Sequence, residues 1–426
     1  MRRTGLFIAV QVAVVAVFAA AYASMPAPLR HALNEEVTGA TYFPAVEIPR
    51  REALVIEPLY DDHELVGDEE LAAVLRHVQP RFDQRRLSPN FVEHALRAWG
   101  IDATFQDPRL PSGEGLKTVL LDHSIYTQSW QDEAPPLLIE QPRGITIRWG
   151  EEPGASLHHD HLLASLTEAG VALDEPVYTP GRRDMTLEAI LQESLRDFDL
   201  DEEEVEWSTL AYALWLPPVT SWRTLDGREM TFDRIAERIV RGHKQLGVCA
   251  GTHRVYSLMV LWRLDRELDD TILSDAVADE VYRYLERVRD LLSECQFDDG
   301  RWPSNWSAGR QAIDEPLPDD IHRQVVSTGH HLEWLAIAPE DLHPPRERIR
   351  RAAGWIINHT VNERPEAIER HYTFYSHVGN ALALWRKTRP ADFWRDWEER
   401  HPFEPEAAGD TFVPPLPAPV PPPPAP

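Results

Sequence analysis

Two kinds of helical segment alternate along the middle of the chain, and this alternation constrains the fold more than any other feature. Segments of the first kind are amphipathic, with apolar residues at i, i+3, i+4 and i+7: 186–198, 232–240, 281–292 and 349–357. Segments of the second kind are apolar on nearly every side: 210–216, 255–262, 332–338 and 381–385. A helix without a polar face must be buried on all sides, so we expect the amphipathic helices to surround the apolar ones.

This pattern predicts an all-α fold of helical hairpins, with inner buried and outer amphipathic helices arranged as an α/α toroid. A two-layer solenoid predicts the same alternation. We expect four hairpins at 186–216, 231–266, 276–338 and 345–386, and a fifth candidate at 68–99. Residues 100–184 interrupt the pattern. There 117–121, 144–149 and 177–179 resemble short strands or extended loops, so we expect a small irregular, β-containing N-terminal cap.

An internal repeat selects the candidate site. The segments 253–258, 330–335 and 377–382 align without gaps, and each begins with a histidine and ends with a leucine. We expect His253, His330 and His377 to begin inner helices and to face one cavity, with Thr209 in the corresponding place of a fourth helix. A histidine can act as an acid, a base or a ligand near neutral pH. The alternative is that each histidine only bonds a neighbouring loop.

The predicted catalytic set is completed by Glu333, a carboxylate close to these imidazoles. The expected ligand-binding residues are near the same histidines in sequence: Arg254, Tyr256, His331 and Trp334. A denser cluster, His158-His-Asp-His161, either contributes to a metal site or forms a polar helix start.

The segment Gln296-Phe-Asp-Asp-Gly300-Arg-Trp302 matches the Q-x-x-x-G-x-W core of the QW repeats of squalene and hopene cyclases. The resemblance implies the α/α-toroid superfamily, which includes protein prenyltransferases, and a structural role in which Gln caps a helix end and Trp packs on it. The cyclases use an acidic D-x-D-D run. The nearest run here, 197–204, lacks its paired final aspartates.

A second, weaker resemblance concerns zinc. The stretch Gly247-Val-Cys249-Ala-Gly251 is similar to the G-x-C-x-G stretch of lanthionine cyclases, in which a second cysteine is followed by a histidine ligand. Here Gln296 follows Cys295, so a third zinc ligand would come from His253 or His330. Zinc prefers Cys and His ligands. Cys249 and Cys295 could instead form a disulfide or remain buried thiols.

The two ends of the chain differ from its middle. Arg2 and Arg3, an apolar run from Leu6 to Tyr22, and small residues at Ala21 and Ala23 indicate a secretory signal cleaved after Ala23, or an uncleaved membrane anchor. We expect an exported protein of the periplasm or cell envelope. The expected divisions are 1–23 signal or anchor, 24–67 extended tether or segment laid on the domain, 68–184 N-terminal helices and cap, 185–402 toroid, and 403–426 proline-rich tail.

Composition limits the partners. The net charge of −27 makes nucleic acid an improbable partner. Two functions remain. In the first, an enzyme binds and transforms a lipid, isoprenoid or glycan in a central cavity by His and Glu acid–base chemistry, and some of the 14 tryptophans line that cavity. In the second, a non-catalytic binding or assembly protein of the cell envelope uses the same scaffold.

Overall fold

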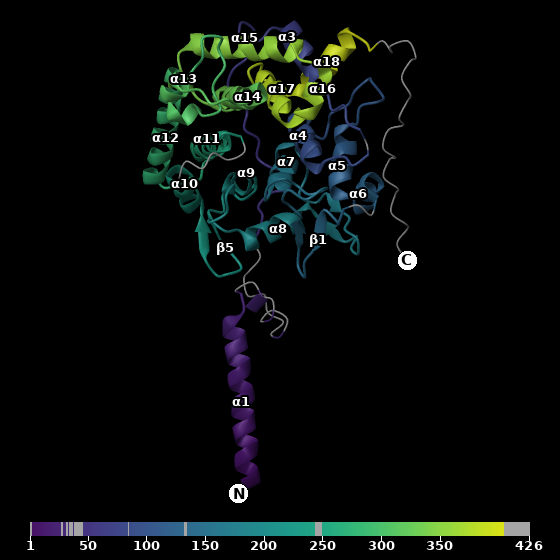
Figure 1. Cartoon of the computed structure of the whole chain (residues 1–426), viewed down its shortest axis with the longest axis vertical. Helices are drawn as coiled ribbons and strands as arrows, with labels where there is room; N and C mark the ends of the chain where they lie inside the picture. The colour runs from purple at the N-terminus through teal and green to yellow at the C-terminus, as the bar shows by residue number, and fades with distance from the viewer. Residues whose placement is uncertain are drawn as a thin grey trace.

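The computed structural model describes residues 2–26, 29–30, 33, 37, 46–83, 85–131, 134–242 and 249–403, and the side chains from residue 11 onward. The described chain is mostly helical, with a few short strands (Figure 1). The proline-rich tail expected at 403–426 lies outside the described residues, except for Phe403.

Six helices form the interior of the domain. They are α4 (Pro89–Trp99), α7 (His161–Glu168), α9 (Val205–Trp215), α11 (Thr252–Glu267), α14 (Ile321–Ile337) and α17 (Tyr372–Leu384). Each packs against the next in a cyclic order, and α17 also packs against α4. Every residue of α9 is buried, as is every residue of α14 from Gln324 onward. The apolar segments of the sequence therefore lie inside, as expected.

Amphipathic helices lie further out: α3 (Asp68–His77), α5 (Gly113–Leu121), α8 (Leu187–Asp197), α10 (Phe232–Arg241), α12 (Asp275–Glu294) and α15 (Arg346–Asn362). Figure 1 shows α10, α12 and α15 at the periphery and α9, α11 and α14 inside them. The predicted apolar face of α15 is its buried face, since Ile349, Ala353 and Ile356 are fully buried. The helical periods of the sequence are thus confirmed.

The remaining elements connect these helices. The shorter helices are α6 (His123–Trp130), η2 (Trp306–Ala308), α13 (Gln311–Asp314), η3 (Glu340–Leu342), α16 (Pro365–Arg370) and α18 (Pro390–Arg400). The strands form three antiparallel pairs: β1 (Leu138–Glu140) with β2 (Ile145–Ile147), β3 (Pro176–Val177) with β4 (Met185–Thr186), and β5 (Ser221–Arg223) with β6 (Glu229–Thr231).

One element prediction in this region was wrong. Residues 117–121, expected to be extended, are the second half of α5, whose N-cap Ser112 accepts a hydrogen bond from the backbone N–H of Gly115. A short apolar run does not distinguish a buried helix from a strand, and here the cap and the packing against α4 favour the helix.

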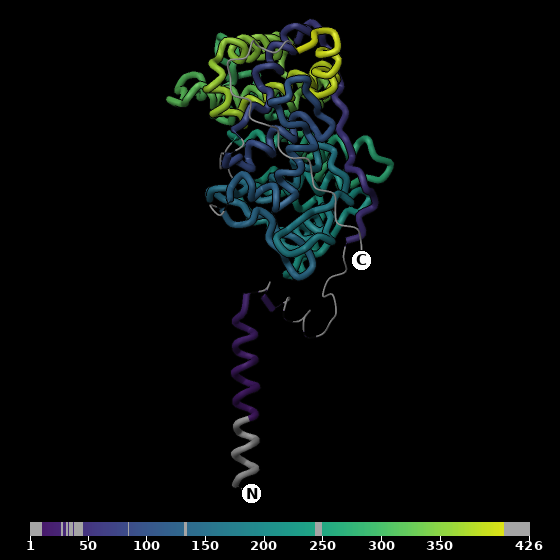
Figure 2. The backbone as a smooth tube through the Cα atoms, turned by 90° about the vertical axis from the view of Figure 1, so that its right-hand side faces the viewer, coloured from purple at the N-terminus to yellow at the C-terminus, as the bar shows by residue number. Residues whose placement is uncertain are grey.

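The N-terminal strap, residues 46–66, crosses the carboxyl ends of the interior helices. Backbone N–H groups of Leu54, Leu59 and Asp62 donate to the carbonyls of Leu214, Ala336 and Trp385 at 2.9, 3.1 and 2.9 Å. Arg263, on α11, donates to the carbonyl of Glu57 at 3.2 Å. Figure 2 shows the strap, in purple, along one side of the domain. The three backbone bonds satisfy carbonyls that the ends of α9, α14 and α17 leave unpaired.

The buried apolar residues form one continuous core from Leu65 to Trp397. The boundary expected at 184/185 falls inside this core, because α4 and α7 pack among the interior helices rather than in a separate cap. The irregular stretches between α4 and α7 hide this in the sequence, since two short helices separated by about 60 residues show no local repeat.

The N-terminal helix α1 (Arg2–Ser24) extends away from the rest of the chain in both views (Figures 1 and 2). Several of its apolar side chains, among them Val12, Val15 and Phe18, are exposed. Of the helices in the described part of the chain, none combines the length and the apolar character needed to cross a membrane.

Candidate functional site

Six aromatic side chains, one from each interior helix, form a closed belt in the centre of the domain. Around the belt the ring centroids of neighbours are 4.8, 3.7, 5.2, 4.6, 4.3 and 4.3 Å apart, in the order His253, His330, His377, His94, His161, Trp207 and back to His253. The three histidines of the sequence repeat therefore come together at one place. The belt is the candidate site.

Two details of the predicted frame were wrong. His330 is the tenth residue of α14 and His377 the sixth of α17, so only His253 stands at the beginning of its helix. The ring that α9 contributes belongs to Trp207, whereas Thr209 is buried and donates to the carbonyl of Val205 at 2.7 Å. The three histidines lie at the same distance before the apolar runs of their helices. The helices themselves begin at different distances before those runs, so the histidines occupy different places in them.

His94 and His161 are the belt members that the repeat missed. His161 begins α7 because the preceding residue, Asp160, is the N-cap in a left-handed conformation (φ 54°). The hydroxyls of Ser194 and Ser208 each donate to Asp160 at 2.6 Å and hold it there. His94 lies in the interior helix α4, where Glu93 and Arg97 are buried as well, and it belongs to no repeat in the sequence.

A second polar layer lies one helical turn further along. Residues three apart share a helix face, so the helices that supply His94, His253, His330 and His377 to the belt also supply the lower layer: Arg97, Tyr256, Glu333 and Asn380. Arg97 bonds Glu168 at 2.5 Å and lies 3.4 Å from Glu333. The hydroxyl of Tyr256 donates to Glu168 at 2.7 Å. This layer is an ion-pair network beneath the imidazoles.

Glu333 orients two belt histidines. Its carboxylate lies 2.7 Å from Nδ1 of His330 and 3.1 Å from Nδ1 of His377, and it accepts a hydrogen bond from Asn380 at 2.8 Å. Burial opposes its ionisation, but His377, Arg97 and His330 together hold the pKa of Glu333 well below its ordinary value. Burial and the neighbouring His330 lower the pKa of His377 to about 3. The stable state is therefore a Glu333 carboxylate beside a neutral His377 imidazole.

The Nε2 nitrogens of four belt histidines have no hydrogen-bond partner among the described residues. The Nε2 atoms of His161, His253, His330 and His377 are buried and make no hydrogen bond within the described part of the chain. Glu93 lies 2.5 Å from Nδ1 of His161, as Glu333 does near the Nδ1 atoms of His330 and His377. Buried polar atoms are normally hydrogen-bonded, so these nitrogens are available to a water molecule or a ligand.

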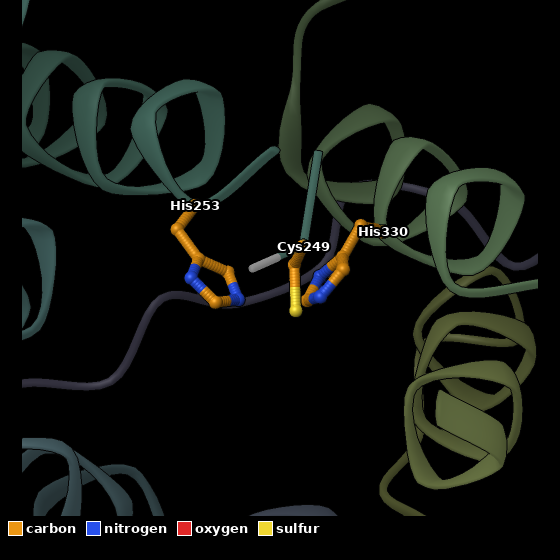
Figure 3. A group of neighbouring side chains, drawn as sticks. All are labelled: Cys249, His253 and His330. Atoms are coloured by element: carbon orange, nitrogen blue, oxygen red, sulfur yellow. The ribbon is translucent and has the colours of Figure 1, made fainter. Parts of the chain in front are cut away.

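Cys249 stands beside two of these imidazoles. One ligand atom from each of Cys249, His253 and His330 lies within 4.8 Å of the others. Figure 3 shows the sulfur between the two imidazole rings. Ala250 and Gly251 both have positive φ, 58° and 73°, which turns the chain so that the cysteine faces the start of α11. Burial raises the pKa of the Cys249 thiol.

Cys295 is not part of this group. Both cysteines are free and buried, so they do not form the disulfide that was one of the alternatives. Cys295 belongs to none of the potential metal-ligand groups among the described residues. It caps α12. Next to it, Gln296 donates to the carbonyls of Gly300 and Arg348 at 2.7 Å each, and the indole of Trp302 donates to the carbonyl of Leu292 at 3.1 Å. The Q-x-x-x-G-x-W segment thus joins α12 to α15.

The other predicted ligand-binding residues lie in different places. Tyr256 belongs to the lower layer, and Arg254 pairs with Glu206 at 2.9 Å. His331 and Trp334 bond each other at 3.1 Å, and His331 packs against Trp302 and Trp306, away from the belt. Of the 158–161 cluster, His158 and His159 pair with Glu204 and Glu202 at 3.0 and 2.8 Å.

Two hollows adjoin the belt. A central cavity lined by Arg97, Glu206, Trp207, His253, Tyr256 and His330 leaves about 10 Å³ for the centre of a water molecule, which is room for about one water. An outer pocket of about 480 Å³ is lined by Leu200, Arg234, Glu237, Arg238, Arg241, Gly242 and Arg254. The Arg254–Glu206 ion pair joins the two linings.

Comparison of the chain with protein-family models, with curated proteins and with solved structures gives no match in any of the three.

Proposed function

We propose that the chain is a zinc enzyme in which Cys249, His253 and His330 bind one zinc ion at the centre of an α/α toroid. The observation that carries the proposal is the coincidence of two facts. The potential ligand atoms of these residues lie within 4.8 Å of one another, and the buried Nε2 atoms of both histidines have no partner in the described chain.

The residues fit zinc in type and in number. Bound to zinc at about 2.0–2.3 Å in a tetrahedron, ligand atoms lie roughly 3.5 Å apart, so side-chain shifts of about 1 Å would complete the site. A thiolate and two imidazoles form a set that favours zinc over magnesium or calcium. Glu333 on Nδ1 of His330 is the kind of carboxylate contact that orients a metal-binding imidazole.

Three protein ligands leave one coordination position open, and a zinc ion bound in this way polarises a water or carbonyl group. The central cavity, which His253 and His330 line, offers the space for that group. His377 is the candidate proton acceptor, because it is neutral and Glu333 contacts its Nδ1 and leaves Nε2 available. Glu333 then acts as the residue that orients both imidazoles.

The toroid assignment is part of the proposal. It is supported by the cyclic packing order of the six interior helices and by the belt, to which each contributes one ring. It is also supported by the parallel course of four of these helices, since the strap bonds α9, α14 and α17 near their carboxyl ends and bonds α11 through Arg263. The likeness to the cyclase and prenyltransferase superfamily is proposed for the fold and not for the activity.

The residues of the outer pocket favour a lipid or glycan ligand that carries a phosphate or carboxylate group. Its volume of about 480 Å³ is in the range of small-molecule sites, and four arginines line it in a protein of net charge −27. The central cavity has room only for the reacting group, so the body of the ligand would lie in the outer pocket. Arg254 lies between the two, beside His253.

Metal analysis tests the centre. The purified full chain should bind one tight equivalent of zinc, and Co²⁺ in its place should give a thiolate-to-cobalt charge-transfer band. Cys249→Ala should abolish this band, whereas Cys295→Ala, the matched removal of the other buried thiol, should retain it. A chain that binds no zinc tightly, or a band that survives in Cys249→Ala, would overturn the proposal.

A second measurement separates an enzyme from a non-catalytic zinc protein. Nitrophenyl phosphate and a neutral nitrophenyl ester are suitable probes. We expect zinc-dependent turnover that favours the anionic probe, and that preference should weaken when Arg234 and Arg241 are both changed to Gln. Tight zinc binding without turnover of either probe would support the binding or assembly function instead.

A further inference from the structure

A second group of imidazoles lies at the beginning of α14, away from the belt. His322 is the second residue of α14 and His359 and Glu363 are at the end of α15, where they share a face at spacing i, i+4. His322 precedes the belt residue His330 by eight positions, which is about 12 Å along a helix. All three side chains are partly exposed, whereas Cys249 and His330 of the proposed zinc site are buried.

The geometry of this group is that of a small coordination site. One ligand atom from each of His322, His359 and Glu363 lies within 4.8 Å of the others. Nε2 of His359 is 3.8 Å from the Glu363 carboxylate. The hydroxyl of Tyr375 stands between the two imidazoles, 3.0 Å from Nδ1 of His322 and 3.1 Å from Nε2 of His359.

Ring stacking holds the imidazoles in place. His359 lies parallel to Trp355, with centroids 5.1 Å apart and an interplanar angle of 6°, and His322 stacks on His371 at 4.0 Å. On its other side, Nε2 of His322 lies 3.7 Å from the carboxylate of Asp320. Burial lowers the pKa of His359.

We propose that His322, His359 and Glu363 bind a second divalent transition-metal ion, Zn²⁺ being the probe, at an exchangeable site open to solvent. Two imidazoles and one carboxylate suit first-row ions, and without a thiolate the site should bind Zn²⁺ more weakly than the buried centre. The ion takes the place between the two nitrogens that the Tyr375 hydroxyl bridges. This site does not depend on the zinc centre, since the two share no residue.

Calorimetric titration of the full chain with Zn²⁺ tests the proposal. We expect one tight and one weaker equivalent. His359→Ala and Glu363→Gln should each weaken the second equivalent by at least about tenfold while leaving the first unchanged. Glu347→Gln, the same change on an exposed carboxylate of α15 that pairs with Arg350, is the matched control. Cys249→Ala should remove the tight equivalent and retain the weaker one.

Tyr375→Phe distinguishes an ion site from a hydrogen-bonded cluster. If the hydroxyl only bridges two histidines, its removal changes stability and has no bearing on metal. If an ion binds between them, Tyr375→Phe keeps the weaker Zn²⁺ equivalent at equal or higher affinity. The proposal is overturned if His359→Ala and Glu363→Gln weaken no Zn²⁺ equivalent of the wild-type chain, whether or not the tight equivalent is present.

Discussion

Nδ1 of His330 lies 2.7 Å from the carboxylate of Glu333, one turn further along the same helix, and that carboxylate reaches Nδ1 of His377 on the neighbouring helix as well. One side chain thus fixes two imidazoles. Gly329, just before His330, faces α17. A Cβ on that glycine would be in van der Waals contact with α17, 3.5 Å from the backbone nitrogen of Val378, so the two helices are closely packed at this point.

Glu333→Gln should weaken zinc binding. The amide keeps the shape of the carboxylate but removes the charge that orients His330, so we expect the dissociation constant for zinc to rise by about 10–100-fold. Competition with a chromophoric chelator measures it. Glu347→Gln serves as the control for the same change on the surface. An affinity within twofold of wild type, in a chain that retains its helical circular dichroism, would contradict the role of Glu333.

The strap should contribute strongly to stability. Tyr60 stacks on Trp385 with centroids 5.2 Å apart, and its hydroxyl donates to the carbonyl of Ala338 at 2.7 Å. Removal of a packed aromatic side chain costs roughly 3 kcal/mol, so Tyr60→Ala should lower the free energy of unfolding by about that amount. Val55, half exposed on the same strap, provides the control Val55→Ala, which should have little effect. Equal losses in the two variants by urea denaturation would show that the strap is not packed at Tyr60.

Stability should fall as the pH rises above neutrality, and His159 should be one cause. Burial opposes its protonation, but Asp160 and Glu202 raise the pKa of His159 to about 10 from the ordinary value of 6.5. The folded chain therefore keeps this proton while the unfolded chain loses it between pH 6.5 and about 10. This contribution is complete below pH 6.5 and is lost through that window.

His159→Gln should therefore flatten the decline of the unfolding free energy over this pH range, as measured by urea denaturation. His63→Gln, a change at a histidine whose side chain is 61% exposed, should leave the slope unchanged. The prediction fails if the slope of the His159→Gln variant equals that of the wild type.

Export remains a prediction from residues 1–23. A reporter enzyme that is active only outside the cytoplasm, fused after residue 40, should be active in cells. Replacing Arg2 and Arg3 by Glu should reduce that activity, because a positive N-terminal segment orients such sequences. Activity of a cytoplasm-specific reporter at the same junction would contradict it.

The helical fold and three of the six belt residues can be predicted from the sequence alone. Helices packed on one side carry apolar residues at a period of 3.6, and helices packed on every side carry them throughout, so burial leaves a local record in both cases. The repeat of His253, His330 and His377 survives for the same reason, since each precedes its apolar run by a constant distance. Glu333 is predicted from its position close to these histidines, and Cys249 from the likeness of residues 247–251 to the G-x-C-x-G stretch.

The packing of the helices sets which further residues belong to the belt and which lie outside it. His94 and His161 enter because α4 and α7 pack into the same cyclic order as helices more than 200 residues away, and no local pattern records such contacts. His331 and Trp334 lie outside the belt because neighbouring residues within one turn of α14 point to different sides of the helix. The cluster of His322, His359 and Glu363 likewise depends on two helices meeting at their ends. Local periodicity encodes burial, whereas the meeting of distant side chains is set by packing.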